Sequence, residues 1–396
     1  MNQKTLVKLA VGCLVLWGVY AYTVSIDSKN SGEKEIELFS DINGETVHKL
    51  VLDQGPTSIE LLVKDGAWTV PSRGDYRADS GKVRSLLLKT LSLIVNQKVT
   101  ELEEGFAKLG LTDEKVKMGN SRILMFDNTD KQLGGLILGD LRKSKLESGH
   151  MVPNGQYVKP VDENVAYVVS TPMTVVASAS YWLDTTLTNI LNNRVLRVTQ
   201  LSINNEEKKV DFVLERGPTK LSELEYVGSL AESERIEDSL FAQVKDGLAD
   251  LKFYDVTKND DDSVKDLTFD KQTKYELENG LVYNVISAEK GEAVYVKLSV
   301  DFDEVLAKES QARAENIKQK ELEESQAQKS SASDSSQSSS ASNGVASLII
   351  SNKEEADKIS KQYEPWIFEF QKYQGSKFRN KKDDLIIKKI EDSKQN

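Results

Sequence analysis

The side chains that most often catalyse reactions or bind metals are sparse in this chain. Histidine occurs only at His48 and His150, whereas a histidine-based metal site or catalytic triad needs several such groups to converge. His48 falls in a strand-like run, which favours an ordinary strand histidine, and His150 falls in a loop sequence. We therefore predict no metal, no cofactor and no catalytic residue, and we expect that the protein is not an enzyme.

Three short motifs resemble functional signatures, and each has a simpler interpretation. Asp260-Asp261-Asp262 lacks the glycine and glutamate of a calcium-binding hand loop, so we interpret it as a solvated turn. Ser287 and Lys290 have the Ser-x-x-Lys spacing, but we expect them in a hairpin turn and the companion motifs are missing. Arg73-Gly74-Asp75 spells an adhesion tripeptide and is interpreted as a turn before a helix.

Two further kinds of chemistry are poorly supported by the residues. Neither standard Gly-rich phosphate loop is present, so ATP hydrolysis in any associated transporter would belong to another subunit. A hydrolase would need acidic residues such as Asp140 or Asp184 to meet a nucleophile in a pocket, which spacing alone does not show.

Composition indicates a mostly globular protein that does not bind nucleic acid. The 396 residues leave room for two or three domains, and 39% of them are hydrophobic. A formal net charge of −11 opposes phosphate-backbone binding, which depends on clustered lysine and arginine. Lysines and acidic residues are mixed in the last twenty or so positions, which is typical of a solvated helix end.

An uncharged apolar run near the N-terminus predicts a membrane anchor. Residues 9–26 contain no charge and approach the length that crosses a bilayer as a helix. Lys4 and Lys8 precede the run, so the positive-inside rule places the N-terminus in the cytoplasm and everything after about residue 27 outside the cytoplasmic membrane. A cleaved signal peptide is the alternative. Cys13 is the only cysteine, so the exterior part has no disulfide.

The same pattern occurs twice along the chain. Residues 59–66 and 210–217 share an order of apolar, charged and glycine positions, 151 residues apart. At that spacing Val47, Leu50 and Leu52 align with Val198, Leu201 and Ile203. Leu86, Leu87, Thr90 and Ile94 align with Leu240, Phe241, Val244 and Leu248 at 154 residues. We infer a duplicated scaffold.

The first copy begins with strands at residues 47–52 and 59–63, joined by a turn at residues 54–57, and extended by residues 68–70. Asp79 is predicted to cap a helix whose apolar face runs from Val83 to Ile94. Four further strands are expected at residues 122–126, 133–138, 156–158 and 166–169.

The second copy repeats this order and adds a long excursion. Strands are predicted at residues 195–203 and 209–214, a helix at 233–251, edge strands at 267–269 and 275–277, and a hairpin of 280–287 with 293–300 closed by residues 288–291. Tyr167 and Trp182 are 15 residues apart, whereas Tyr295 and Trp366 are 71 apart. The difference indicates an insertion of about 56 residues, with an exposed helix at residues 304–329 and a Ser-rich flexible loop at 330–342.

Several short motifs are similar to those of a known family. They are Trp68, Tyr76-Arg77-Ala78-Asp79, Leu109-Gly110-Leu111, Leu136-Ile137-Leu138-Gly139-Asp140, Tyr167-Val168-Val169, Tyr181-Trp182-Leu183-Asp184 and Trp366-Ile367-Phe368-Glu369. On these motifs most of residues 45–390 resembles the family catalogued as domain of unknown function 4340. Arg77, where the family often has proline, and the Ser-rich insertion depart from its pattern.

The resemblance implies a membrane segment followed by a repeated extracytoplasmic domain. It also implies a link to accessory components encoded beside gliding-motility-type ABC transport systems, and it brings no catalytic residue. The motif positions that we expect to matter structurally are Trp68, Tyr76, Asp79, Gly110, Gly139, Trp182 and Trp366.

These observations predict an α+β protein with an N-terminal transmembrane helix and two tandem, mostly antiparallel sheet-plus-helix units. The expected division is residues 1–27 for the cytoplasmic N-terminus and membrane helix, 28–44 for a tether, 45–194 for the first repeat, and 195–396 for the second, with the insertion at about 304–352. The predicted function is that of a non-enzymatic accessory protein, anchored in the lipid bilayer through residues 9–26, that contacts an ABC-type permease or related membrane subunit. An extracytoplasmic cell-wall or polymer-binding adhesion module is the alternative.

Overall fold

The computed structural model describes residues 36–95, 97–146, 150–205, 207–217, 223–327 and 341–389. The chain divides into two compact units, one of residues up to 72 with 77–182, the other of residues 73–76 with those from 183 onward. Each unit combines an antiparallel sheet with helices, so the α+β prediction is confirmed. The membrane helix expected at residues 9–26 lies outside the described residues. None of the helices within the described ranges is long and apolar enough to span a membrane.

The first unit is built on a nine-stranded sheet. Its order is β5 (Tyr76–Arg77), β4 (Ala67–Val70), β3 (Thr57–Lys64), β2 (Lys49–Gln54), β8 (Ser121–Phe126), β9 (Gln132–Lys145), β10 (Met151–Pro160), β11 (Ala166–Val169) and β7 (Gln97–Thr100). A small pair is formed by β1 (Ile36–Glu37) and β6 (Ile94–Val95). The helical elements are η1 (Gly44–Thr46), η2 (Pro71–Arg73), α2 (Ser80–Leu91), α3 (Glu103–Lys108), α4 (Asp113–Lys117) and α5 (Ala179–Trp182).

The second unit is built on an eight-stranded sheet. Its order is β15 (Leu224–Tyr226), β14 (Glu207–Arg216), β13 (Val195–Asn204), β19 (Lys271–Leu277), β20 (Leu281–Lys290), β21 (Ala293–Phe302), β22 (Trp366–Gln371) and β18 (Asp255–Lys258). Two small pairs join β12 (Thr186–Thr188) to β17 (Leu251–Lys252) and β16 (Glu234–Ile236) to β23 (Ile386–Lys388). The helical elements are η3 (Asn192–Arg194), α6 (Asp238–Lys245), η4 (Asp262–Val264), α7 (Glu304–Ala327), α8 (Ala341–Tyr363), α9 (Lys372–Gly375), η5 (Ser376–Phe378) and α10 (Lys382–Leu385).

Apart from β5 at one edge of the first sheet, the two sheets have the same topology. Strands β4-β3-β2-β8-β9-β10-β11-β7 of the first unit occupy the places of β15-β14-β13-β19-β20-β21-β22-β18 in the second. The helix between the opening hairpin and the later strands, α2 or α6, also starts in the same way. The Asp79 amide donates to the Trp182 carbonyl oxygen at 2.7 Å, and the Glu237 amide donates to the Leu385 carbonyl oxygen at 2.9 Å. The chain therefore contains one fold twice.

The register of β13 differs from the spacing of 151 residues that the strand pattern indicates. On β2 the fully buried residues are Leu50 and Leu52, and on β13 they include Val198 and Gln200. Leu201, predicted to align with Leu50, is half-buried on the opposite side of the strand. A bulge in the β13–β14 pairing lies between Gln200 and Leu201. A shift of one residue turns every side chain of a strand to the other face. An error of one residue in the spacing therefore aligns side chains of the two copies that lie on opposite faces of the sheet.

Several predicted elements have different limits. The helix expected at residues 233–251 is α6, Asp238–Lys245, because residues 234–236 pair as β16 with β23. The strand expected at an edge near residues 275–277 is β19, which lies between β13 and β20 inside the sheet. Residues 267–269 form no strand. The hairpin of β20 and β21 is confirmed, but its strands extend to Lys290 and Ala293, so the turn is tighter than predicted.

The insertion lies where the spacing places it. Five residues separate β10 from β11, whereas α7 and α8 lie between β21 and β22, and α8 packs against β21. The predicted loop at residues 330–342 lies mostly outside the described residues.

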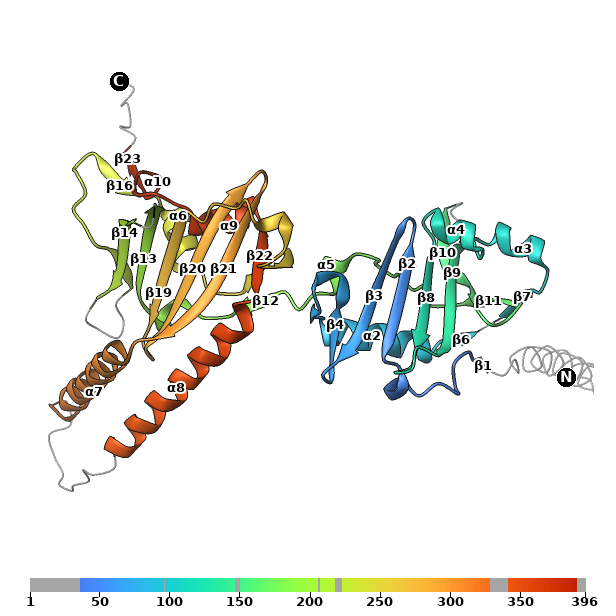
Figure 1. Ribbon diagram of the computed structural model, residues 1–396, viewed down its shortest axis with the longest axis horizontal. Helices are drawn as coiled ribbons and strands as arrows, with labels where there is room; N and C mark the ends of the chain where they lie inside the picture. Colours follow the sequence, from blue (N-terminus) through green and yellow to red (C-terminus); the bar gives the residue numbers. More distant parts are fainter. Residues whose placement is uncertain are drawn as a thin grey trace, which may run out of the picture. The chain divides into compact units, whose positions relative to one another are not determined.

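The core of the first unit lies under α2, which crosses one face of its sheet (Figure 1). Alternate residues of β2 and β8 are fully buried, among them Leu52, Ile123 and Met125, as expected for strands with one covered face. The helix buries Val83, Leu86, Leu87 and Thr90. Each such apolar side chain contributes about 1.5–3 kcal/mol when fully buried, so the sheet holds α2 in a defined rotation.

Candidate binding groove of the first unit

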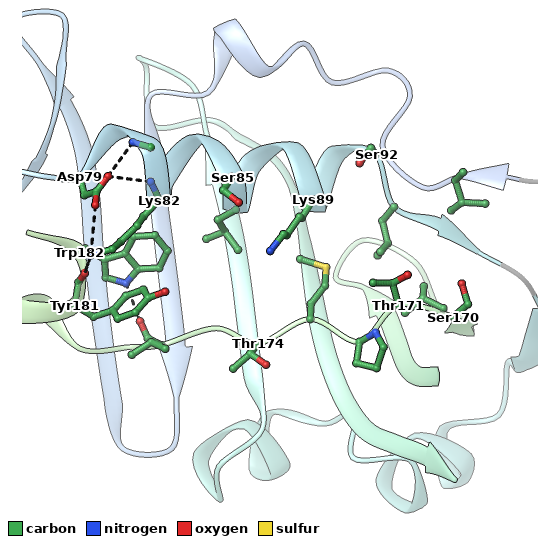
Figure 2. A pocket seen from close by; sticks show the side chains of 18 residues that line it. Asp79, Lys82, Ser85, Lys89, Ser92, Ser170, Thr171, Thr174, Tyr181 and Trp182 are labelled. Carbon is green, nitrogen blue, oxygen red and sulfur yellow. Dashed lines mark hydrogen bonds and ion pairs between the residues drawn. The ribbon is translucent and has the colours of Figure 1, made fainter. Parts of the chain in front are cut away.

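A groove of about 890 Å³ opens beside α2 in the first unit. One wall is α2 and its C-terminal continuation to Ile94, and the other is the segment of residues 169–182, named here the return segment. Figure 2 shows the two walls side by side, with the return segment running in the opposite direction to the helix. The groove is therefore made by segments nearly ninety residues apart in the sequence.

The helical wall presents a polar stripe because its apolar positions face the sheet. Asp79 caps the helix as predicted, and one of its carboxylate oxygens accepts hydrogen bonds from the amides of Gly81 and Lys82 at 3.0 and 3.1 Å. Residues three and four apart lie on one side of a helix. Lys82, Ser85, Lys89 and Ser92 consequently line the groove together.

The return segment is held in place by two buried polar side chains. Gln156 donates to the Gly139 carbonyl oxygen at 3.2 Å, and its own side-chain oxygen accepts from the Met173 amide at 2.8 Å. Trp182 donates from its ring nitrogen to the Val176 carbonyl oxygen at 2.7 Å. Met173 and Val175 point inward and are buried, so the segment is fixed although it is neither helix nor strand.

Two outward threonines of the return segment keep free polar groups. Thr171 and Thr174 line the groove and are exposed. Within the described part of the chain, neither takes part in a hydrogen bond through its main chain or its side chain. Main-chain donors and acceptors are therefore available along this wall.

The groove is positively charged although the chain is acidic. Its charged lining residues are Lys82, Lys89 and Asp79. Lys82 donates to the Tyr181 carbonyl oxygen at 2.9 Å, and its ammonium lies 3.4 Å from Asp79 and 4.9 Å from the centre of the Tyr181 ring. Lys89 is exposed, and its side chain has no ion pair or hydrogen bond among the described residues. Lys89 is thus the charge most open to a ligand.

The equivalent segment of the second unit is folded differently. After β22 the chain forms α9, η5 and α10, and η5 and α10 pack against α6. Phe378 is 0% exposed, and its carbonyl oxygen accepts from the side chains of Gln200 at 3.0 Å and Thr273 at 3.3 Å. The return segment of the second unit is therefore packed into its own sheet.

Two of the predicted motif positions, Asp79 and Trp182, lie in the groove. Asp79 and Trp182 meet there through the hydrogen bond between their main chains. Gly139 lies against Leu109, since a Cβ on Gly139 would overlap the Leu109 carbonyl oxygen, and a Cβ on Gly110 would overlap the side chains of Asn120 and Asp140. Gly110 has φ +76° and its carbonyl oxygen accepts from the Asn120 side chain at 2.7 Å. Glycine is required at both positions.

The remaining motif positions are aromatic. Trp68 lies on β4, where its carbonyl oxygen accepts from the Ala78 amide at 2.8 Å. Tyr76 belongs to the second unit by its contacts, and its ring packs edge-on against Phe253 and Trp366 at centroid distances of 5.4 and 5.0 Å. These aromatic residues pack in or beside the cores.

The residues of the three short motifs are engaged in other contacts. Asp261 caps η4 by accepting from the Ser263 amide at 2.9 Å. Ser287 lies within β20 and is fully buried, not in a turn as predicted, while Lys290 pairs with Asp266 at 2.8 Å. Arg73 forms a two-pronged ion pair with Asp255 at 2.6 and 2.7 Å.

The other candidate groups are dispersed. His48 bonds to the Thr46 carbonyl oxygen at 3.0 Å, and the His150 side chain is exposed beyond β9. Asp140 accepts from the Asn120 side chain at 3.2 Å. Across the ranges that the structure describes, no group of three or more histidine, cysteine, aspartate or glutamate residues is arranged to hold a metal ion.

Sequence reasoning missed Lys82, Ser85 and Lys89 as groove residues. Their spacing of three and four along a predicted helix marks a polar stripe. A polar stripe is also what any solvent-exposed helix face shows, so the pattern has no specificity without the opposite wall. The return segment supplies that wall, and its uncharged residues were expected only to be too polar for a membrane.

One family matches this chain. Residues 68–272, more than half of the chain, match the family described as "Domain of unknown function (DUF4340)". The match begins on β4 of the first unit and ends in β19 of the second. It therefore includes α2, both walls of the groove and the strands from β5 to β18. No curated protein and no solved structure matches the chain. The match establishes that the chain belongs to the DUF4340 family.

Proposed function

We propose that this protein is a non-enzymatic accessory subunit of an ABC-type transport complex and that it holds a partner in the groove between α2 and the return segment. In this proposal residues 9–26 anchor the chain in the cytoplasmic membrane, and both units lie outside that membrane. The observation that carries the binding role is the open groove of the first unit, at a place where the second unit packs its own chain.

The polar groups of the groove support binding in preference to acid–base chemistry. Its one carboxylate, Asp79, is occupied as the cap of α2. Lys82 is bonded to a main-chain carbonyl oxygen, and a lysine held in this way is a poor general base. The groove residues include neither histidine nor cysteine. A site of hydroxyl groups, lysine and apolar floor residues suits recognition.

The transport assignment depends on the resemblance to accessory components encoded beside gliding-motility-type ABC transport systems. A duplicated scaffold without a Gly-rich phosphate loop fits a subunit that works beside a separate ATPase and permease. Genes for an ATPase and a permease next to the gene for this protein would agree with the assignment.

The test is recovery of the partner from the membrane. The full-length protein, tagged at its C-terminus, is crosslinked in intact cells, solubilised in mild detergent and captured, and the captured proteins are identified by mass spectrometry. An unrelated single-pass protein with the same tag is the control. We expect specific recovery of a permease and an ATPase subunit, and their absence under gentle conditions would refute the assignment.

A polymer-binding or adhesion module is the second candidate, and one observation favours it. Tyr181 is 44% exposed at one end of the groove, beside Lys82 and a row of serine and threonine side chains. Exposed aromatic rings next to hydroxyl groups are suited to sugars. This candidate requires retention of the detergent-solubilised protein on purified cell wall and loss of retention in Tyr181→Ala.

A further inference from the structure

The groove has the length and direction of a short extended peptide. The helical wall follows α2 from its cap at Asp79 to Ser92, beyond its last turn. A helix rises 1.5 Å per residue, so the twelve residues of α2 extend about 18 Å. An extended chain covers the same length with about five or six residues at about 3.3 Å each.

The return segment offers a main-chain edge to such a peptide. Thr171 and Thr174 are exposed, and their main-chain groups make no hydrogen bond within the described residues. Unpaired main-chain edges are the sites at which extended peptides add to a protein as an extra strand. A polymer without amide groups would leave these donors and acceptors unpaired.

The charge of the groove selects an acidic occupant. Lys82 and Lys89 line the same wall, seven positions apart, and therefore about 10 Å apart along the helix axis. The floor between the walls is apolar, with Leu86, Leu93 and Met173. Acidic side chains that alternate with apolar ones in an extended peptide would meet both surfaces, because alternate residues of a strand face opposite sides.

The second unit lacks the same features. The equivalent caps Asp79 and Glu237 are 158 residues apart, so Lys82 corresponds to Leu240 and Lys89 to Gly247. Ser85 corresponds to Gln243, which is exposed on α6 as Ser85 is on α2. The positive groove is thus a property of the first unit, and the second unit supplies control positions.

We infer that the groove of the first unit binds an extended, acidic segment of a protein partner, paired along the return segment and held by the unpaired charge of Lys89. This inference rests on the proposed function, since the segment belongs to the protein that the subunit accompanies. An anionic polymer is the competing occupant and is distinguished by the test.

The test measures binding of a defined probe to the full-length protein in detergent. The probe is a fluorescein-labelled octapeptide of alternating glutamate and valine, and its counterpart carries lysine in place of glutamate. We expect fluorescence anisotropy to show saturable binding of the acidic peptide alone. Ser85→Trp, which fills the groove, and Lys89→Glu, which reverses its free charge, should each weaken binding about tenfold or more.

The controls are Gln243→Trp, at the position equivalent to Ser85, and Ser239→Glu, at another exposed position of α6, and both variants should bind the peptide as the unmodified protein does. Equal weakening by both sets of variants would overturn the inference, as would equal binding of the basic peptide or no binding of the acidic one. Displacement by poly(glycerol phosphate), together with failure of the acidic peptide to bind, would identify a polymer site and also overturn it.

The two proposals fail in different ways. If the acidic peptide binds but no transporter subunit is captured from cells, the groove inference stands and the transport assignment falls. If transporter subunits are captured equally with the unmodified protein and with Ser85→Trp, the assignment stands and the groove is not the contact.

Discussion

At the scale of single residues, a buried ion pair shows how the sheet of the second unit accommodates charge. The Lys271 ammonium lies 2.7 Å from an Asp211 carboxylate oxygen and 2.7 Å from the Ser202 hydroxyl. The two charged side chains are 5% and 13% exposed. Ser202 and Lys271 are cross-strand partners on β13 and β19. Removing either charge would leave the other buried without compensation.

Asp211→Ala is therefore expected to lower the free energy of unfolding by about 3–5 kcal/mol. The double variant Asp211→Leu with Lys271→Met should lose less than the single variant, because it leaves no unpaired charge. Urea unfolding of the second unit measures both. Glu225→Gln, on an exposed position of β15, is the control and should change stability by less than about 0.5 kcal/mol. Equal losses in the single and double variants would contradict this account.

At the scale of elements, the two return segments show how one place in a fold takes two forms. In the first unit the segment is an irregular wall fixed by Gln156 and Trp182. In the second it is a series of short helices tied to β20 by Glu289, whose carboxylate lies 2.8 Å from Lys372 and 3.2 Å from Arg379. The neighbouring Lys372 ammonium, followed by Arg379, holds the pKa of Glu289 below its usual range.

The contribution of Glu289 should depend on pH. A carboxylate whose pKa is lower in the folded state stabilises the fold above its unfolded-state pKa, about 4.3, and loses that contribution as the pH falls through the folded-state pKa. Because Glu289 is 37% exposed, we expect Glu289→Gln to cost only about 0.5 kcal/mol at pH 7. Denaturant unfolding at pH 7 and below pH 4 checks this. A difference that persists undiminished at the lower pH would count against the assigned ion pairs.

At the scale of the whole molecule, the duplicated fold forms two compact units, each with its own buried side chains. In the first unit these include Leu52 and Met125, and in the second Tyr275, Phe368 and Phe378. Because the cores are separate, a destabilising substitution in one unit should leave the hydrogen-exchange protection of the other unit unchanged.

Phe378→Ala tests this expectation, since the side chain is 0% exposed and its loss should cost about 3–5 kcal/mol. Hydrogen exchange followed by mass spectrometry should show faster exchange in β13, β19 and β20 and unchanged exchange in β2 and β8. Tyr373→Ala, at a 71% exposed position nearby, should change neither unit. Faster exchange of equal size in both units would show that they do not have independent stability.

Local patterns in the sequence were sufficient for much of the fold. The strand pairs around Gly55 and Gly291, the cap at Asp79 and the long insertion before Trp366 follow from alternation, turn residues and capping chemistry, which act over a few positions. The duplication followed from comparing those patterns. The family match agrees with the resemblance found in the short motifs.

Only the tertiary structure decided the register of the repeat and the existence of the groove. Register depends on which face of β13 is buried and on the bulge beside Gln200, which alternation alone does not specify. The groove requires Lys89 on α2 to face Thr174 on the return segment. The shape of that segment is set by the side chains of Gln156 and Trp182. Such contacts join residues far apart in the chain, so no local sequence pattern predicts them.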